Sequence, residues 1–410
     1  MCTKSILLLF TLGVLLIAYR MYNILQRPMP LDLDQPEKLR FVDELGRIAR
    51  FLENGLEYLG ITPASRPLKV LVDLVLSLLT NPIIRIPDNI KITEEVFNGV
   101  KVHVYTPTGG SKPLPVFVFF HGGGWTWFSV GTYNAALRNF ANKTNHVVIA
   151  VDYRKAPQDI FPAAYDDCLA VTEHVLENTQ TLNIKKDAIS LAGDGSGGNI
   201  AAAVAIALKE KIKMQLLINP ALQMVNFKTP SYQDNEDVLA GLTSPEKVAA
   251  AWLRYAGMPL DLKSTLLSNQ HISLDIHKKY WNLLNSKYHV PKYLNVTKKK
   301  TVYPREKADR ISFVFDELIA DVRFCPMLTT KLDNLPSTYI ITSQYDVLRD
   351  EAIMYSHRLQ QAGIKVKLRH YKNGFHGFFH FAHRCLLQFK SSKLALEHLV
   401  SFLNFNNFHN

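Results

Sequence analysis

The sequence predicts an α/β protein with a mostly parallel central sheet of about eight strands and helices on both faces. Short apolar runs typical of buried strands alternate with segments of helical periodicity over residues 116–218 and again over 339–402. Between them, residues 224–335 are polar, irregular and rich in Tyr, Asn and Lys, which indicates an insertion at the top of the sheet. The 410 residues suffice for one large α/β domain with such an insertion.

The predicted strands begin with a hairpin. Residues 91–97 and 100–105 are two β-rich runs separated by Asn98-Gly99, a strong signal for a tight turn. The later strands are continuous apolar runs, which are typical of strands buried on both faces. They cover residues 116–120, 147–151, 188–192, 216–218, 339–342 and 365–370.

Helical periodicity marks the segments between and around these strands. Residues 30–90 are interpreted as largely helical, with one helix around residues 39–52 and a second over 68–79. Further helices are predicted over residues 132–141, 164–176, 197–208, 351–362 and 392–402. We expect residues 30–90 and 224–335 to form together a cap above the carboxyl-terminal edge of the sheet.

The N-terminus is strongly apolar. Residues 6–19 contain few polar groups, and interface-type residues extend this stretch toward the roughly 20 residues that a spanning helix needs. A cleaved signal peptide is the alternative, but Ala18-Tyr19-Arg20 lacks the small residues of a cleavage site. We therefore expect residues 1–25 to be an uncleaved signal anchor and residues 26–410 to be the globular domain.

The chain is basic, with a formal net charge of +11 and a pI near 9.3. Nucleic acid is the first anionic partner to consider, but no zinc-finger spacing, basic helix or aromatic-basic pattern supports it. The densest basic run is Lys298 to Lys300, followed by Arg305 and Lys307. We interpret this run as a solvated surface loop, with contact to anionic lipid head groups as the alternative.

The cysteines and the glycosylation acceptors carry a weaker signal. Of the four cysteines, Cys2 lies in the apolar N-terminus, and the other three, Cys168, Cys325 and Cys385, are widely spaced. We therefore expect mostly buried free thiols, and the sequence indicates no metal site or cofactor. N-x-S/T acceptors begin at Asn142 and Asn295, and they are compatible with a lumenal domain.

The first chemical motif follows the strand over residues 116–120. It reads His121-Gly122-Gly123-Gly124, and consecutive glycines let backbone N–H groups converge on one point. We expect Gly122, Gly123 and Gly124 to form an oxyanion hole. The alternative is an ordinary glycine-rich turn, because a run of glycines alone is weak evidence, but His-Gly-Gly-Gly directly after a strand is more specific.

The second motif lies between a predicted strand and an alanine-rich helix. A nucleophile elbow has the pattern G-x-S-x-G, in which a strained turn exposes the central serine. Here Gly193, Asp194 and Gly197 fit the elbow, but its centre is Gly195 and Ser196 comes one place later. Ser196 could attack only if the turn shifted by one residue.

The remaining two motifs supply an acid and a base. Asp346 follows an apolar strand, where the carboxylate of a catalytic triad belongs, whereas nearby Asp350 fits a helix cap. His376 lies in a glycine-flanked loop after the last strand. The order elbow, acid, histidine is the order of an α/β-hydrolase site.

At these residues the chain resembles the hormone-sensitive-lipase-like esterases of the α/β-hydrolase fold, and most closely the arylacetamide deacetylase-like proteins. The resemblance covers nearly the whole chain and rests on residues 36–40 (PEKLR), 121–125 (HGGGW), 153–157 (YRKAP), 161–167 (FPAAYDD), 346–350 (DVLRD) and 374–377 (GFHG). It implies a single-pass endoplasmic reticulum protein with a lumenal catalytic domain that hydrolyses esters or amides of hydrophobic acids.

The chain departs from this family pattern in two places. The family elbow has serine at the position of Gly195, and the family often has a cysteine pair at positions that match Thr126 and Ser343. Both cysteines are absent here, as expected if a disulfide was lost as a unit.

Two functions follow from these motifs. The first is a membrane-anchored, serine-type carboxylic ester or amide hydrolase for hydrophobic acyl substrates, with Ser196, Asp346 and His376 as its triad. The alternative is a catalytically silent family member that binds a hydrophobic ligand or a protein, because the elbow centre is Gly195. The sequence does not indicate an oligomeric state.

Overall fold

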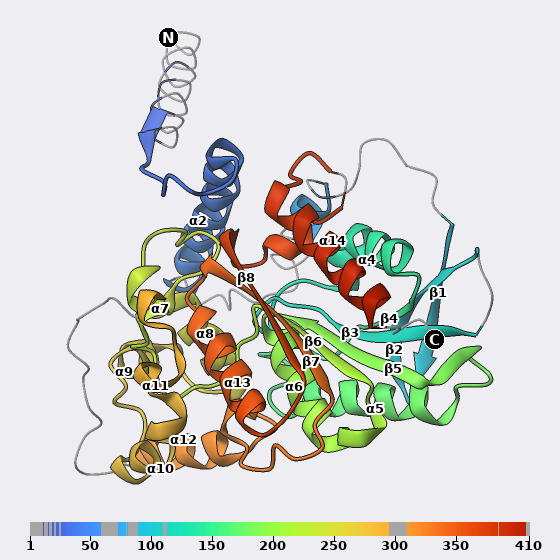
Figure 1. Cartoon of the computed structure of the whole chain (residues 1–410). Coiled ribbons are helices and arrows are strands. Elements are labelled where there is room, and N and C mark those ends of the chain that lie inside the picture. The colour runs from blue at the N-terminus through green and yellow to red at the C-terminus, as the bar shows by residue number, and fades with distance from the viewer. Residues whose placement is uncertain are drawn as a thin grey trace.

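The computed structural model describes most of the chain. The described residues are 26–58, 73–78, 80, 89–109, 113–294, 310–383 and 385–406, with a few single residues before 26. Their centre is one eight-stranded sheet with the strand order β1-β2-β4-β3-β5-β6-β7-β8 (Figure 1).

The sheet confirms the predicted α/β class and each of the predicted strands. β1 pairs with β2 and β2 with β4 in antiparallel fashion, whereas every pairing from β4 to β8 is parallel. The strands are β1 (Ile90–Phe97), β2 (Val100–Pro107), β3 (Leu114–Phe120), β4 (Val147–Val151), β5 (Ile184–Asp194), β6 (Met214–Ile218), β7 (Ser337–Tyr345) and β8 (Val366–Phe375).

Helices cover both faces of the sheet and create two cores. On β3, Val116, Val118 and Phe120 point into one core, while Phe117 and Phe119 point into the other. This alternation follows from the two-residue period of a strand, and all five side chains are buried. The first core is closed by α5 (Ala163–Glu177), α6 (Ser196–Leu208) and α13 (Arg349–Gln361), and the second by α4 (Val130–Thr144) and α14 (Lys390–Phe405), as Figure 1 shows.

The segment between β6 and β7 is a set of short helices. None is longer than 12 residues, and α7, α9 and α11 have only four or five, so a helical period is hard to recognise in the sequence. They are α7 (Pro230–Asp234), α8 (Pro245–Ala256), α9 (Lys263–Leu267), α10 (Leu274–Leu284), α11 (Ser286–His289) and α12 (Arg310–Ala320), with single turns at Leu260–Leu262, Lys292–Leu294 and Pro326–Leu328. Outside this segment, single turns lie before β6, at Lys209–Lys211, and after β8, at Phe378–Phe381.

The long helix α2 (Pro36–Tyr58) contacts this segment. Asp43 Oδ1 accepts a hydrogen bond of 2.7 Å from the Gly241 N–H, and Arg254 forms an ion pair of 2.6 Å with Glu53. The two backbones also approach very closely, since a Cβ on Gly46 would lie 1.9 Å from the carbonyl oxygen of Gly241. A close glycine contact, a hydrogen bond and an ion pair thus hold these two distant parts of the sequence side by side.

Several sequence predictions fall on residues that the structure does not describe. These are most of residues 1–25, parts of the 30–90 segment, the acceptor Asn295 and the basic run from Lys298. Within the described residues, no helix is both long and apolar enough to cross a bilayer. Cys168, Cys325 and Cys385 are free thiols, as expected, and the first two are buried.

Candidate active site

The four chemical motifs meet at one edge of the sheet. His121 follows β3, Gly195 follows β5, Asp346 follows β7 and His376 follows β8. These four strands are parallel, so their carboxyl ends lie at the same edge, which is where open α/β sheets place their sites.

The elbow keeps the register set by its outer glycines. A Cβ on Gly193 would lie 2.1 Å from the Gly197 carbonyl oxygen, and one on Gly197 would lie 2.0 Å from the Phe120 carbonyl oxygen. Both positions therefore require glycine because strand and helix backbones touch there. Gly195 lies at the centre with φ +55 and ψ −113, and its N–H donates to the Ile218 carbonyl at 2.9 Å. The backbone is that of a strained elbow with position 195 at its apex.

Position 195 points at the histidine. A Cβ built on Gly195 would lie 3.6 Å from Nε2 of His376. Ser196 instead begins α6, is 3 % exposed, and has its hydroxyl beside the phenol of Tyr153. Its Oγ makes no hydrogen bond within the described part of the chain. The structure therefore does not bring Ser196 to His376.

Asp346 and His376 lie together. Nδ1 of the histidine is 3.1 Å from Oδ1 of the aspartate, although the ring N–H is not aligned for a linear hydrogen bond. The buried carboxylate also accepts hydrogen bonds from the side chain of Asn219 at 2.5 Å and from the N–H of Leu348 at 2.9 Å. These donors fix the carboxylate, which in turn favours the imidazole tautomer that leaves Nε2 free.

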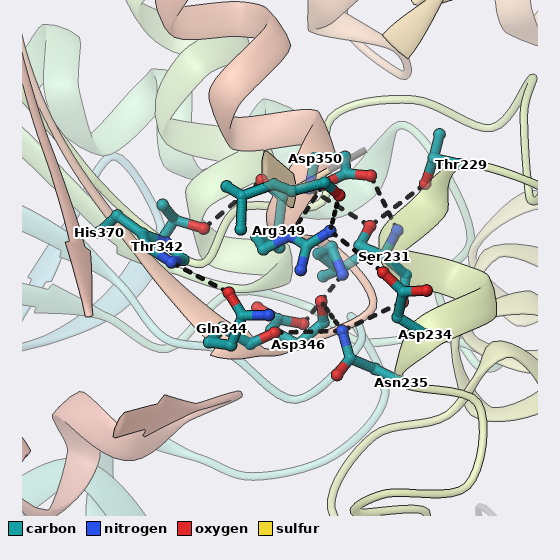
Figure 2. Close-up of polar contacts among 12 residues, drawn as sticks. Thr229, Ser231, Asp234, Asn235, Thr342, Gln344, Asp346, Arg349, Asp350 and His370 are labelled. Carbon is teal, nitrogen blue, oxygen red and sulfur yellow. Dashed lines mark hydrogen bonds and ion pairs between the residues drawn. The ribbon is translucent and has the colours of Figure 1, made fainter. Parts of the chain in front are cut away.

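The turn that carries Asp346 is fastened to α7. Asn235 Nδ2 donates to the carbonyl oxygen of Asp346 at 3.2 Å, and Ser231 Oγ donates to that of Val347 at 2.7 Å. The buried pair of Arg349 and Asp350 extends this network, because Asp350 accepts from the Ser231 N–H at 2.8 Å (Figure 2). The acid is thus positioned by the insertion as well as by β7. The expectation that Asp350 caps a helix is wrong: α13 begins at Arg349 after Leu348 as its N-cap, and Asp350 lies in the first turn with contacts to Ser231 and Arg349.

The electrostatics of the site favour a charged histidine. Burial alone would lower the pKa of His376, but the carboxylates of Asp346 and Asp194 outweigh it and raise the pKa above 6.5. Burial likewise raises the pKa of Asp194, while His376 and the Tyr133 hydroxyl oppose that rise. The neighbouring ammonium of Lys247, whose own pKa burial lowers to about 8, acts against protonation of His376.

The glycine run after β3 abuts the elbow. A Cβ on Gly122 would lie 2.9 Å from the Asp194 carbonyl oxygen. The Gly122 N–H donates to the Tyr133 hydroxyl at 3.2 Å, and that hydroxyl donates to Asp194 Oδ2 at 2.9 Å. Gly122 thus differs from its expected role as a donor to a ligand. The N–H groups of Gly123 and Gly124 have no acceptor among the described residues, so they are the available donors of the run.

Sequence reasoning missed three groups at this site. Asn219 holds Asp346, Tyr133 links Gly122 to Asp194, and Lys247 contributes positive charge near His376. A signal existed for Asn219, because it directly follows β6, the strand between those that carry the elbow and the acid. Tyr133 and Lys247 lie on helices, and only the folded chain brings them to the site.

Comparison with known proteins agrees with this geometry. A family model described as the alpha/beta hydrolase fold matches residues 117–279 and 287–380. The neutral cholesterol ester hydrolase 1 of Bos taurus is 31% identical over 91% of this chain and 93% of its own. The arylacetamide deacetylase of Bos taurus is 32% identical over 90% of this chain and 92% of its own.

Solved structures support the same fold. The hyperthermophilic esterase from the archaeon Pyrobaculum calidifontis has a TM-score of 0.59 at 24% identity and covers 89% of this chain and 98% of its own. An ester hydrolase from the metagenome of Lake Arreo has a TM-score of 0.61 at 22% identity and covers 91% of this chain and 99% of its own. From the family model and the curated relatives together, the chain belongs to the carboxylesterase and deacetylase type of the α/β-hydrolase family.

Proposed function

We propose that this chain binds hydrophobic esters or amides in an α/β-hydrolase site that forms no acyl-enzyme. One observation carries the proposal: the elbow aims position 195 at Nε2 of His376 across 3.6 Å, and that position is glycine. The supporting groups remain, since Asp346 lies 3.1 Å from His376 and the glycine run adjoins the elbow. The site thus keeps its binding frame and lacks the attacking hydroxyl.

The ligand class follows from the relatives. Their names specify hydrolysis of a cholesterol ester and deacetylation of an arylacetamide, so we propose a bulky hydrophobic group on the ester or amide. Residues 30–90 and 224–335 would form the cap over this ligand. In support, Trp125 of the glycine run stacks on Tyr255 of α8 at a centroid distance of 4.4 Å.

We further propose that residues 1–25 anchor the protein in the endoplasmic reticulum membrane, with the domain in the lumen. The apolar N-terminal segment without a cleavage pattern supports the anchor. The two acceptors at Asn142 and Asn295 support the lumenal side, and Asn142 is exposed on α4.

The proposal is tested by restoring the missing side chain. The wild type should form no covalent adduct with a fluorophosphonate probe, whereas Gly195→Ser should be labelled at residue 195. With a short-chain p-nitrophenyl ester, Gly195→Ser should exceed the wild type in kcat by about a thousandfold or more, since the lost triad nucleophile commonly costs that much. The serine replaces only hydrogen by a side chain that points at His376.

The rival function is a serine hydrolase with a shifted elbow that presents Ser196. It predicts probe labelling of the wild type and loss of that labelling in Ser196→Ala. That result would contradict the proposed function. The close contact between Gly193 and Gly197 opposes this shift. A shifted elbow would move Asp194 toward the place of Gly193, which has no room for a side chain.

A further inference from the structure

We propose that this site hydrolyses activated esters in a single step, with a water molecule in place of the serine hydroxyl and His376 as its general base. The inference rests on the proposed function, because it concerns a site without an acyl-enzyme. It adds an activity that a lost nucleophile would ordinarily exclude. Glycine at position 195 is then a feature of the mechanism.

Position 195 has room for that water. A Cβ on Gly195 would have only Nε2 and Cε1 of His376 within 4 Å, at 3.6 and 3.7 Å, apart from its own chain neighbours and within the described residues. A hydrogen bond to a ring nitrogen spans about 2.8–3.0 Å. An oxygen bound to Nε2 and in van der Waals contact with the Gly195 Cα therefore lies beside the line that joins these two atoms, in the space that a Cβ at position 195 would fill. The side chain of His376 is 24% exposed, and solvent therefore reaches the ring.

The histidine is prepared to take a proton. Asp346 lies 3.1 Å from Nδ1 and favours the proton on that nitrogen, which leaves the lone pair of Nε2 toward position 195. Asp194 provides a second carboxylate that stabilises the charged ring. Asn219 acts indirectly, because its side chain donates to Asp346 and so holds the carboxylate that faces the ring.

The step balances without another reactant. Nε2 of His376 takes one proton from water while the water oxygen forms a bond to the ester carbonyl carbon. The carbonyl electron pair moves to its oxygen, where the N–H groups of Gly123 and Gly124 are the available donors. When the tetrahedral intermediate collapses, the bond to the leaving oxygen breaks and that oxygen receives the proton from Nε2. The products are a carboxylic acid and an alcohol.

Two substitutions at one position separate this mechanism from simple loss of activity. Gly195→Ala places a methyl group 3.6 Å from Nε2, where it excludes the water but supplies no nucleophile. Gly195→Ser has the same Cβ and the same backbone strain at φ +55. An active, folded serine variant therefore shows that the fold accepts a side chain at this position, so that any loss in the alanine variant has a chemical cause.

The test uses p-nitrophenyl acetate and the full-length protein. We expect the wild type to hydrolyse it above the buffer rate, with no initial burst and a solvent isotope effect above one. His376→Ala and Gly195→Ala should each lower the rate by about a hundredfold, which is typical of a lost general base. Free imidazole should restore part of the rate to His376→Ala, and thermal melts should show that both variants are folded.

The failures are distinguishable. A wild-type rate equal to buffer, or one that Gly195→Ala or His376→Ala leaves unchanged, would overturn the single-step mechanism while the proposed function stands. A burst or a labelled wild type would overturn the proposed function itself. Equal rates for Gly195→Ala and the wild type would show that no catalytic water occupies position 195.

Discussion

At the scale of single residues, His376 determines when the site can work. Three charged groups face it: Asp346 on the turn after β7, Asp194 at the end of β5 and Lys247 on α8. Burial and Lys247 favour the neutral ring, but the two carboxylates prevail and raise its pKa above 6.5. The raised pKa enlarges the protonated fraction of the ring at any given pH, and the protonated ring cannot act as a base.

This shift predicts the pH dependence of Gly195→Ser. Since only the neutral ring accepts a proton, kcat/KM should be constant at high pH and fall as the pH drops through a midpoint above 6.5. Asp346→Asn in the same background should move the midpoint to lower pH and reduce kcat by up to about 10⁴-fold, as loss of a triad acid does. A pH–rate profile measures both effects, and an unmoved midpoint would refute the assignment of Asp346 as the main carboxylate.

At the scale of elements, α2 meets the insertion through glycines. A Cβ on Gly46 would lie 1.9 Å from the Gly241 carbonyl oxygen, so Gly46→Ala must push the two backbones apart. We expect it to lower the free energy of unfolding by about 1–3 kcal/mol, the usual cost of overpacking. Urea denaturation measures this change.

The same helix offers a matched control. Gly55 also lies in α2, but a Cβ there would meet no described atom within 4 Å. Gly55→Ala should therefore raise stability by up to about 1 kcal/mol, because alanine is the better helix former. Equal effects of the two substitutions would show that the close contact between Gly46 and Gly241 does not hold the two segments together.

The elements also show what the sequence could predict. The strands were predictable because a strand buried on both faces is one continuous apolar run, as in β3 and β4. The helices α7 and α9 were not, since each has only 5 residues and too few turns to show a period. The glycine run and the elbow were recognisable because close backbone contacts at these positions leave no room for a side chain other than that of glycine.

At the scale of the whole molecule, the site depends on contacts that no local pattern contains. Asn219 holds Asp346 only because β6 lies beside β7, and Tyr133 reaches Asp194 only because α4 covers that face of the sheet. The order of strands decides both, and it arises from the packing of the entire chain. By contrast, the outer glycines of the elbow already indicated that position 195 is its centre, from which a side chain would point at His376.

The orientation of the molecule at the membrane gives the last prediction. If residues after about 25 are lumenal, as proposed above from the absent cleavage site, the two acceptors and the family resemblance, Asn142 is accessible to glycosylation, because it is exposed in the last turn of α4. Endoglycosidase treatment of the protein from microsomes should then increase its gel mobility, and Asn142→Gln should remove part of that shift. Asn295→Gln tests the second acceptor, and the double variant should show no shift. A wild type that never shifts and is digested by protease added to intact microsomes would place the domain on the cytosolic side instead, because an intact membrane protects only lumenal domains.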